Sequence, residues 1–446
     1  MVRLAAPLVL SEIGWMAMGV VDTMAVGRVS AEAIGAVSLG AMIFYAVGVF
    51  ASGLLLGLDT LVAQSFGAGD LDDCRHSLIN GIWLAVFLIP LVMAAVWATI
   101  PLLAVLGINP AVLRETRPYI KALNWSAPSL LLFFALRRYL QAVNIVRPIM
   151  MTLLTANLVN LAGNWVLVYG NLGAPRLGAE GSGWATCISR VYMMAVLGIV
   201  ILSHDRGLIG SSWRPDFRRI RRLLELGFPA ALQIGLETGV FATVTVLIGK
   251  LNAAALAAHQ IALATVSMTY MMPLGISSAA AVRVGHALGR DDPDGAARSG
   301  WTALALGGLV MSSAALALLV IPHGIARAFT PEPEIIAAGV VLLRVAAFFQ
   351  LFDGFQVVAT GALRGAGDTR TPMFCHFAGY WIIGLPLGAM LCFGRRLGAA
   401  GLWMGLSAGL ILIGVVLVGF WQRAARGFRR SSACVSPKGG AAEAER

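Results

Sequence analysis

Residues 35–61 read GAVSLGAMIFYAVGVFASGLLLGLDTL, an apolar run in which Asp59 is the single charged side chain. Because the hydrocarbon core of a bilayer takes about 20 apolar residues of helix, this run is long enough to cross a membrane. Eleven more runs of the same character occur along the chain: 4–26, 77–104, 119–141, 148–169, 181–203, 224–248, 256–281, 299–323, 336–362, 372–393 and 399–422. The sequence therefore predicts an all-α membrane protein with twelve transmembrane helices.

The composition favours a membrane protein over a soluble one. Hydrophobic residues make up 58% of the 446 residues and charged residues 12%, whereas soluble domains carry about 25% charged residues. The apolar runs are continuous, while the strands of a transmembrane barrel would alternate over about ten residues. The length of the chain therefore reflects many membrane helices rather than several soluble domains.

The net charge of +11 comes mainly from Arg residues in the short connections between apolar runs. If both termini are cytoplasmic, the inner segments hold 22 of the 33 Lys and Arg residues, the outer segments hold 10, and Arg190 falls within a run. Cytoplasmic loops carry such an excess of positive charge. We therefore expect cytoplasmic termini, and a lipid bilayer rather than a nucleic acid beside the basic residues.

An internal repeat is the strongest sign of how the chain is organised. Segments about 220–224 residues apart match: 27–31 (GRVSA) with 249–253 (GKLNA), 147–150 with 370–373, and 177–179 with 397–399. Six helices repeated in the same topology are related by an axis along the membrane normal. The sequence thus predicts two pseudo-symmetric six-helix bundles around a central cleft, which suits alternating access.

The repeat divides the chain into four parts. We expect an N-terminal six-helix lobe at 1–203, a basic cytoplasmic linker at 204–222, a C-terminal six-helix lobe at 223–422 and a disordered cytoplasmic tail at 423–446. The end of the tail is rich in Gly, Ala and Glu, a composition that does not favour a packed core.

Two carboxylates, Glu237 and Asp353, fall in the middle of predicted spans. An ionised side chain there costs about 2.5–3.5 kcal/mol on insertion scales, so each must pair, bind a cation or hold a proton. Lying near each other, the two could share one proton or one Na⁺. The alternative is a buried hydrogen bond to Gln350 or Gln356.

A third carboxylate, Asp22, lies in the first span and has possible partners in the fifth. Asn160 and Asn164 are four residues apart, so they share one face of a helix. Two amide oxygens and a carboxylate are suitable ligands for a cation. Two alternatives stay open: the amides could join helices by hydrogen bonds, or Asp22 could reach water at a helix end.

Other polar residues in the runs have simpler interpretations. Asp59 lies near the inner end of its run, so we expect it to reach water. His259 is expected to be a histidine with its hydrogen bonds satisfied, and the loop 365–369 (GAGDT) to cap a helix. The sequence has no Walker motif, HExxH motif or zinc spacing, so no cofactor is expected other than a coupling ion, Na⁺ or H⁺.

Several of these segments together resemble the multidrug and toxic compound extrusion (MATE) family, in its bacterial NorM-like branch. The matching segments cover about residues 3–422 and are: Val21–Thr23, Gly27–Arg28, Val62–Gln64, Gly67–Gly69, Ala257–Ala262, Arg283–Gly289, Gly361–Gly365 and Asp368–Arg370. The resemblance implies a monomeric, polyspecific exporter of amphipathic, often cationic drugs in the bacterial inner membrane. It also implies exchange against Na⁺ or H⁺.

The resemblance assigns site residues as well. The family's cation-coupling positions fall on Asp22, Asn160, Asn164, Glu237 and Asp353, with Na⁺ at Glu237 and Asp353. Substrate contacts are expected at Asp22, Glu237, Asp353, Phe349 and Gln260. The family often has Tyr four residues before the helix 10 carboxylate, where this chain has Phe349. The change removes a hydroxyl ligand from the expected Na⁺ site.

Four other functions fit a polytopic membrane protein. A lipid-linked oligosaccharide flippase of the same superfamily should have more cations in its cleft, whereas the charges within these spans are mainly acidic. A major facilitator should have a DRxGRR-like loop, which segment 70–75 (DLDDCR) does not fit. A membrane-embedded transferase needs a large loop bearing acids or metal ligands, and no loop here exceeds about 20 residues. A channel would suit a duplicated pair of lobes less well than a transporter.

Overall fold

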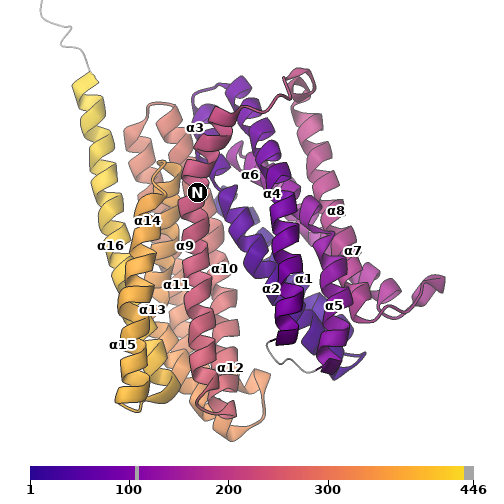
Figure 1. The fold of residues 1–446 in the computed structure, drawn as a ribbon. Coiled ribbons are helices and arrows are strands. Elements are labelled where there is room, and N and C mark those ends of the chain that lie inside the picture. Colours follow the sequence, from indigo (N-terminus) through magenta and orange to yellow (C-terminus); the bar gives the residue numbers. More distant parts are fainter. Residues whose placement is uncertain (106–109, 436–446) are drawn as a thin grey trace, which may run out of the picture.

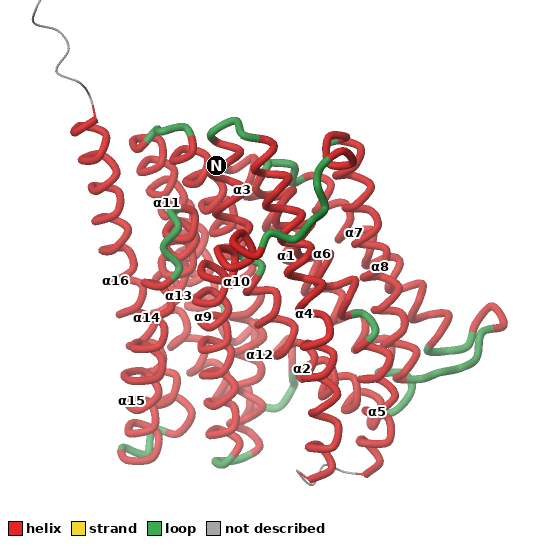
Figure 2. The backbone as a smooth tube through the Cα atoms, turned by 45° about the horizontal axis from the view of Figure 1, so that its top comes forward, coloured by secondary structure: helices red, strands yellow, loops and turns green. Residues whose placement is uncertain are grey.

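The computed structural model describes residues 1–105 and 110–435, and within these ranges all regular secondary structure is helical. Figures 1 and 2 show the helices as two bundles side by side. The all-α fold expected from the sequence is confirmed.

The first bundle contains eight α-helices and a short 3₁₀ turn. They are α1 (Val2–Val26), α2 (Ala31–Leu54), α3 (Gly57–Gly67), α4 (Leu71–Val105), α5 (Pro110–Asn124), α6 (Ala127–Ala142), α7 (Arg147–Leu167), the turn at Asn171–Gly173 and α8 (Ala179–His204). A second 3₁₀ turn, Arg206–Gly210, follows in the linker.

The second bundle contains α9 to α16. They are α9 (Phe217–Gly249), α10 (Ala253–Gly289), α11 (Pro293–Val320), α12 (Pro322–Phe329), α13 (Pro333–Gly365), α14 (Arg370–His376), α15 (Leu385–Ala389) and α16 (Gly398–Val435). Two π-helical segments, Phe377–Gly384 and Met390–Gly394, flank α15 in the same span.

Eleven of the described helices or helix pairs are long and apolar enough to cross a membrane, and α5 with α6 makes a twelfth span if the bent pair is counted once. The run expected at 119–141 is therefore two helices that meet at 47°. The bend lies at Trp125 and Ser126, just before Pro128 at the start of α6. Proline has no amide hydrogen to donate and favours the first turn of a helix, which explains why a new helix begins there.

Each bundle has its own apolar core, and a few residues pack into the core of the other bundle. The first core is formed mostly by residues before 203 and the second mostly by residues after 240. Leu4 and Leu8 of α1 nevertheless pack into the second core, whereas Ile220 and Leu223 of α9 pack into the first. The bundles are thus joined by shared apolar contacts near the start of α1 and the start of α9.

Close backbone packing strengthens this seam between the lobes. A Cβ atom on Gly57 of α3 would lie 2.5 Å from the carbonyl oxygen of Leu223, and one on Gly67 would collide with the backbone of His286 in α10. Only glycine allows backbones to come this near. The seam lies at the end of the molecule that carries the N-terminus, where α3 sits in Figure 1.

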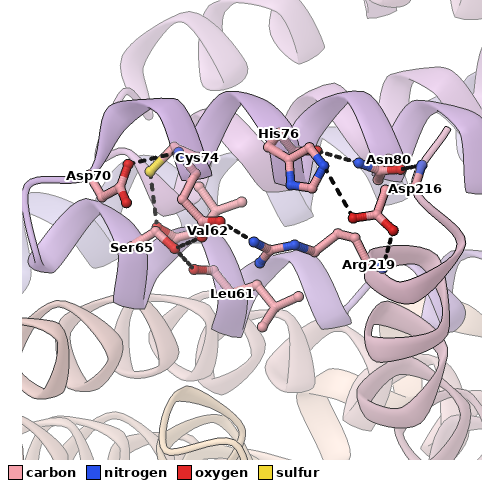
Figure 3. Close-up of polar contacts among 10 residues, drawn as sticks. Leu61, Val62, Ser65, Asp70, Cys74, His76, Asn80, Asp216 and Arg219 are labelled. Atoms are coloured by element: carbon pink, nitrogen blue, oxygen red, sulfur yellow. Dashed lines mark hydrogen bonds and ion pairs between the residues drawn. The ribbon is translucent and has the colours of Figure 1, made fainter. Parts of the chain in front are cut away.

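The connection between the lobes is held against the first lobe by polar contacts (Figure 3). The backbone amide of Asp216 donates to Asn80 Oδ1 at 2.7 Å, and the Asp216 carboxylate faces His76 Nε2 at 3.5 Å. Arg219 pairs with Asp73. These bonds attach the start of α9 to α4, so the connection is a docked segment rather than a free tether.

The same connection is fastened at its beginning by an ion pair. Arg75 Nη2 lies 2.8 Å from Asp205 Oδ1, and hydrogen bonding to this guanidinium holds the pKa of the Asp205 carboxyl below its usual value. Asp205 directly follows α8, so the pair ties the end of that helix to α4.

The end of the connection between the lobes and the start of the tail lie at other residues than the sequence predicts. Helix α9 begins at Phe217 instead of after residue 222, because the Asp216 side chain accepts the Arg218 and Arg219 amides as an N-cap. The expectation of disorder from residue 423 is wrong as far as Val435, where α16 ends. The remainder of the predicted tail, 436–446, lies outside the described residues.

Candidate functional site

The Asp22 carboxylate lies in the first lobe and accepts three hydrogen bonds. Its Oδ1 accepts from Asn160 Nδ2 at 2.9 Å and Asn164 Nδ2 at 2.8 Å, and its Oδ2 accepts from Thr186 Oγ1 at 2.7 Å. All four side chains are buried. The three helices α1, α7 and α8 thus converge on one carboxylate, which does not reach water.

Helix geometry explains how the donors come together. Asn160 and Asn164 lie one turn apart on α7, as their spacing predicts, and Thr186 comes from the neighbouring α8. A Cβ on Gly163 would lie 3.0 Å from Ala185 Cβ, so the glycine allows α7 and α8 to pack closely. Because both amides present nitrogen to Asp22, this arrangement holds a carboxylate without needing a cation.

Arg190 is a charged neighbour of this group that was recognised in the sequence only as an Arg within a run. It lies one turn after Thr186 on α8, its Nη1 donates to Ser126 Oγ at 2.5 Å, and its guanidinium lies 4.7 Å from the centre of the Phe44 ring. It is close enough to Asp22 to attract its charge. An arginine in the middle of a membrane helix is a signal that a carboxylate lies nearby.

The second lobe holds the other predicted pair, Glu237 on α9 and Asp353 on α13. Asp353 is buried, and Oδ1 of its carboxylate accepts a hydrogen bond from Gln356 Nε2 at 2.9 Å. Glu237 is half-buried, and Asp353 is close enough to repel its charge. The hydrogen bond to Gln356 is the one weighed in the sequence analysis, whereas Gln350 donates to Thr269 instead.

Two tyrosines complete this carboxylate pair. Gln356 Nε2 also donates to the Tyr380 hydroxyl at 3.2 Å, and Tyr270 of α10 interacts with Glu237. Tyr380 lies in the π-helical segment Phe377–Gly384, and such segments are frequent at functional sites. Neither tyrosine was predicted, because nothing in the local sequence shows that these positions lie beside the carboxylates.

Tyr45 on α2 shows which way Glu237 faces. This residue belongs to the first lobe, yet it is within electrostatic reach of both Glu237 and Glu12, and its side chain is 52% exposed. Glu237 therefore lies on the side of the second lobe that faces the first lobe.

The other two predicted substrate contacts, Phe349 and Gln260, differ in their surroundings. Phe349 is buried, and its ring centre lies 6.1 Å from that of Trp403. Gln260 is exposed near the beginning of α10. The structure does not join either residue to the carboxylates by a hydrogen bond, so their role in substrate binding stays a prediction.

His259 matches the simpler interpretation given to it. Its ring is buried, Trp403 Nε1 donates to His259 Nδ1 at 3.0 Å, and Nε2 lies 2.8 Å from Thr245 Oγ1. Both ring nitrogens are therefore occupied, and the histidine links α9, α10 and α16. The capping role of the 365–369 loop is also confirmed, since Asp368 Oδ1 accepts the Thr371 amide at 3.0 Å.

Asp59 is not at a wet helix end, and that expectation is wrong. Its side chain is 1% exposed, and its Oδ2 lies 3.5 Å from Arg138 Nη1 of α6 and 3.5 Å from Arg364 Nε of α13. Arg138 belongs to the first lobe and Arg364 to the second. Asp59 is buried because the second lobe covers the end of α3 at the seam.

Two further hydrogen bonds cross the seam beside Asp59. Thr60 Oγ1 donates to the carbonyl of Arg364 at 2.6 Å, and Gln64 Nε2 donates to the carbonyl of Gly365 at 3.1 Å. We call Asp59, Thr60, Gln64, Arg138 and Arg364 the interlobe latch. The latch joins the lobes at the end of the molecule near the N-terminus.

A second buried ion pair also went unrecognised in the sequence. Glu12 Oε1 lies 2.5 Å from Arg137 Nη2, and both side chains are almost completely buried. The 22 Lys and Arg residues counted as inner include Arg137, but the structure places this residue within α6. Glu12 lies in the middle of the run 4–26, where the cost of a charge in the bilayer could have revealed it, whereas Arg137 lies near the end of the run 119–141, where a charge is ordinarily assumed to reach water.

The described residues contain no group of three or more His, Cys, Asp and Glu side chains that could hold a metal ion. A Na⁺ ion at Glu237 and Asp353 would therefore need oxygen ligands from elsewhere. The Tyr270 hydroxyl and the Gln356 amide oxygen, which is buried without a hydrogen-bond partner, are of the right chemical type.

A profile of the MatE family matches residues 7–166 and 229–390. The two matched segments begin 222 residues apart, which is the offset of the internal repeat. The match covers most of both lobes, including Asp22 and Glu237.

Two bacterial relatives match nearly the whole chain. It is 38% identical over 432 residues to "Probable multidrug resistance protein NorM" of Rhodopseudomonas palustris, covering 95% of this chain and 91% of that protein. It is 35% identical over 431 residues to the protein of the same name from Mesorhizobium japonicum, covering 94% and 92%.

Among solved structures, the chain is similar to the eukaryotic MATE transporter AtDTX14. The TM-score is 0.86 at 21% identity, over 96% of this chain and 97% of that chain. At this identity the match confirms the fold alone.

Proposed function

Because the chain belongs to the MatE family, we propose that it exports small amphipathic, often cationic molecules in exchange for Na⁺ or H⁺. The chain is a multi-pass membrane transporter and not an enzyme. The names of the bacterial relatives support drug-like substrates, and the acidic groups of the second lobe support positively charged ones.

The observation that carries the proposal is the pair of carboxylates without a basic partner. Among the described residues, neither Glu237 nor Asp353 takes part in an ion pair. Two negative charges at mid-membrane repel each other and cost free energy unless a proton or a cation joins them. A mobile cation therefore has a reason to visit this site.

Competition for one site would couple the inward movement of the ion to the export of the substrate. A cationic substrate and the coupling ion would each neutralise Glu237 and Asp353, so binding of one favours release of the other. Inward movement of one positive charge contributes about 2.3 kcal/mol per 100 mV of membrane potential. Because Asp353 is buried and Glu237 is half-buried, the charge of the bound species strongly affects the free energy of the site.

Alternating access would require the interlobe latch to open. We place the termini in the cytoplasm on the distribution of Lys and Arg, so the latch would close the cytoplasmic side while the opposite ends of the lobes stay open. To face inward, the lobes would have to break the Asp59–Arg364 contact and the hydrogen bonds of Thr60 and Gln64.

The flippase alternative is not favoured by the cations of the seam. Arg137, Arg138 and Arg364 lie near carboxylates of Glu12 and Asp59 instead of standing free to bind a phosphate. A phosphate-bearing substrate would have to displace these partners.

The test is efflux of a cationic dye from dye-loaded, right-side-out vesicles of the bacterial membrane, with the Na⁺ gradient and the pH gradient imposed separately. We expect one of the two gradients to drive efflux by the wild-type protein. Vesicles without the protein are the control. Efflux that persists when both gradients and the membrane potential are dissipated would refute ion-coupled exchange.

A further inference from the structure

Two adjoining cavities lie beside the seam, outside the carboxylate sites. The first, about 330 Å³, is lined by polar and charged residues at the start of α9 and in the loop before α14: Arg222, Glu225, Leu226, Gly367, Asp368, Thr369 and Arg370. The second, about 370 Å³, runs along α9 and α14 and is lined mainly by apolar side chains: Leu224, Glu225, Phe228, Pro229, Leu232, Arg370, Met373 and Phe374. Glu225 and Arg370 line both, so the polar cavity continues into the apolar one.

The polar cavity presents both signs of charge. Arg222 and Arg370 are positive, whereas Glu225 and Asp368 are negative. Glu225 pairs through Oε2 with Arg222 Nη1 at 3.1 Å and through Oε1 with Arg221 Nε at 3.2 Å, and one oxygen of Asp368 caps α14. Arg370 is exposed. The cavity is therefore suited to a ligand that carries one positive and one negative group.

The apolar cavity opens toward the surroundings of the protein. The side chain of Phe228 is 53% exposed and that of Phe374 is 62% exposed, on two helices that are membrane spans or parts of them. Exposed aromatic side chains of a membrane span ordinarily contact lipid, and an apolar groove between spans fits an acyl chain. A charged cavity leading into such a groove has the layout of a phospholipid, with a headgroup at the end of a chain.

We propose that these cavities form a binding site for a phospholipid whose zwitterionic headgroup ends in a primary amine, that is, phosphatidylethanolamine. Its phosphate would accept hydrogen bonds from Arg370 and Arg222, and its ammonium group would donate to the Glu225 and Asp368 carboxylates. One acyl chain lies along Phe228, Met373 and Phe374. A trimethylated choline headgroup has no N–H to donate, and an anionic glycerol headgroup has no ammonium group to place beside Glu225 and Asp368.

The proposed lipid site borders the seam between the two lobes. The Phe228 ring centre lies 6.4 Å from that of Phe50 on α2, in the other lobe. The neighbouring Gly227 packs against the backbone of Leu54. A lipid held on α9 and α14 therefore sits directly beside the seam, at the end of the molecule where the interlobe latch lies.

The proposal is tested by native mass spectrometry of the full-length protein, delipidated in detergent. The probes are dioleoyl phosphatidylethanolamine, phosphatidylcholine and phosphatidylglycerol, which differ in headgroup only. We expect the wild-type protein to bind the ethanolamine lipid most tightly. R370Q should weaken that binding about tenfold, since hydrogen bonds between charged groups are among the strongest. E225Q should reduce the affinity for the ethanolamine lipid to the affinity for the choline lipid.

Two further variants distinguish recognition of the headgroup from binding of the acyl chain and from attraction by general surface charge. F374A should weaken the binding of all three lipids equally, because it removes part of the apolar groove that would hold the acyl chain. R298Q should change nothing, since Arg298 is an exposed arginine outside both cavities. Equal binding of the three lipids by the wild-type protein, tightest binding of the glycerol lipid, or unchanged binding by R370Q would overturn the proposal. The readout is independent of transport.

Discussion

The carboxylates of the two lobes differ in how their charge is balanced. Asp22 in the first lobe accepts three hydrogen bonds and has Arg190 nearby. Asp353 in the second lobe accepts one hydrogen bond, from Gln356, and lies close enough to Glu237 to repel its charge. The difference favours different roles for the two lobes. The first lobe holds a carboxylate whose hydrogen bonds are satisfied, and the second lobe receives the mobile cation.

This asymmetry arises although the lobes repeat the same helices. At the offset of 222 residues, Asp22 corresponds to Val244 and Glu237 corresponds to Trp15. The duplication thus preserved segments such as 27–31 and 249–253 but not the charges within the spans. Equivalent backbones therefore place different chemistry on the two sides of the molecule.

Neutralising the second-lobe carboxylates should have the largest effect. We expect E237Q and D353N to reduce gradient-driven dye efflux to that of vesicles without the protein, because neither variant retains a pair of charges for a cation to bridge. E334Q is the matched control, since Glu334 is an exposed carboxylate on the same helix as Asp353. Efflux by E237Q at the wild-type rate and with unchanged ion dependence would remove the second lobe from coupling.

Breaking the interlobe latch should reduce stability strongly. D59N leaves Arg138 and Arg364 buried without their carboxylate, and loss of one partner of a buried pair costs about 3–5 kcal/mol. A lowered thermal unfolding midpoint in detergent checks this. D72N, which removes a 91% exposed carboxylate from its pair with Arg75, should leave the midpoint nearly unchanged. Equal midpoints for D59N and the wild-type protein would show that the latch contributes little.

A mutant cycle at Asp22 and Arg190 measures the compensation inferred for the first lobe. D22N and R190M alone should each lower the unfolding midpoint, and the double variant should recover part of the loss, with a coupling of about 0.5–3 kcal/mol. E237Q should instead raise the midpoint, because it removes repulsion from Asp353. If the effects of D22N and R190M on the midpoint are additive, Arg190 does not compensate Asp22. If E237Q destabilises the protein as D22N does, the two lobes do not differ in how their charges are balanced.

The smallest effect is expected from Y380F. This variant removes the hydroxyl that accepts a hydrogen bond from Gln356, and one such bond contributes about 0.5–1.5 kcal/mol. We expect the ion concentration for half-maximal efflux to change less than about tenfold, with the maximal rate retained. Complete loss of transport would mean that Tyr380 itself binds the ion.

Part of the candidate site followed from local spacing. Asn160 and Asn164 were expected on one face of their helix, and both reach Asp22 in the structure. Glu237 and Asp353 stood out because a charge in the middle of an apolar run is costly. Such residues are recognisable in sequence since the reason for noticing them lies within a single helix.

The residues that went unnoticed depend on contacts between distant segments. Arg137 lies near the end of its run and alone suggests contact with water, yet it forms a buried pair with Glu12. Glu12 lies in the middle of its run, so the sequence shows that this carboxylate needs a partner but not which residue supplies it. Tyr380 and Tyr270 are ordinary aromatic residues until the fold brings them beside the carboxylates.

The sequence by itself determined the number and character of the membrane spans and their duplication, because hydrophobicity and repetition are read along the chain. Only the tertiary structure decided which charges are compensated. Asp59 meets Arg364, 305 residues later in the chain, solely because the two lobes close on each other at the seam. The free energy of a buried charge depends on the groups around it in space, and those groups come from other helices.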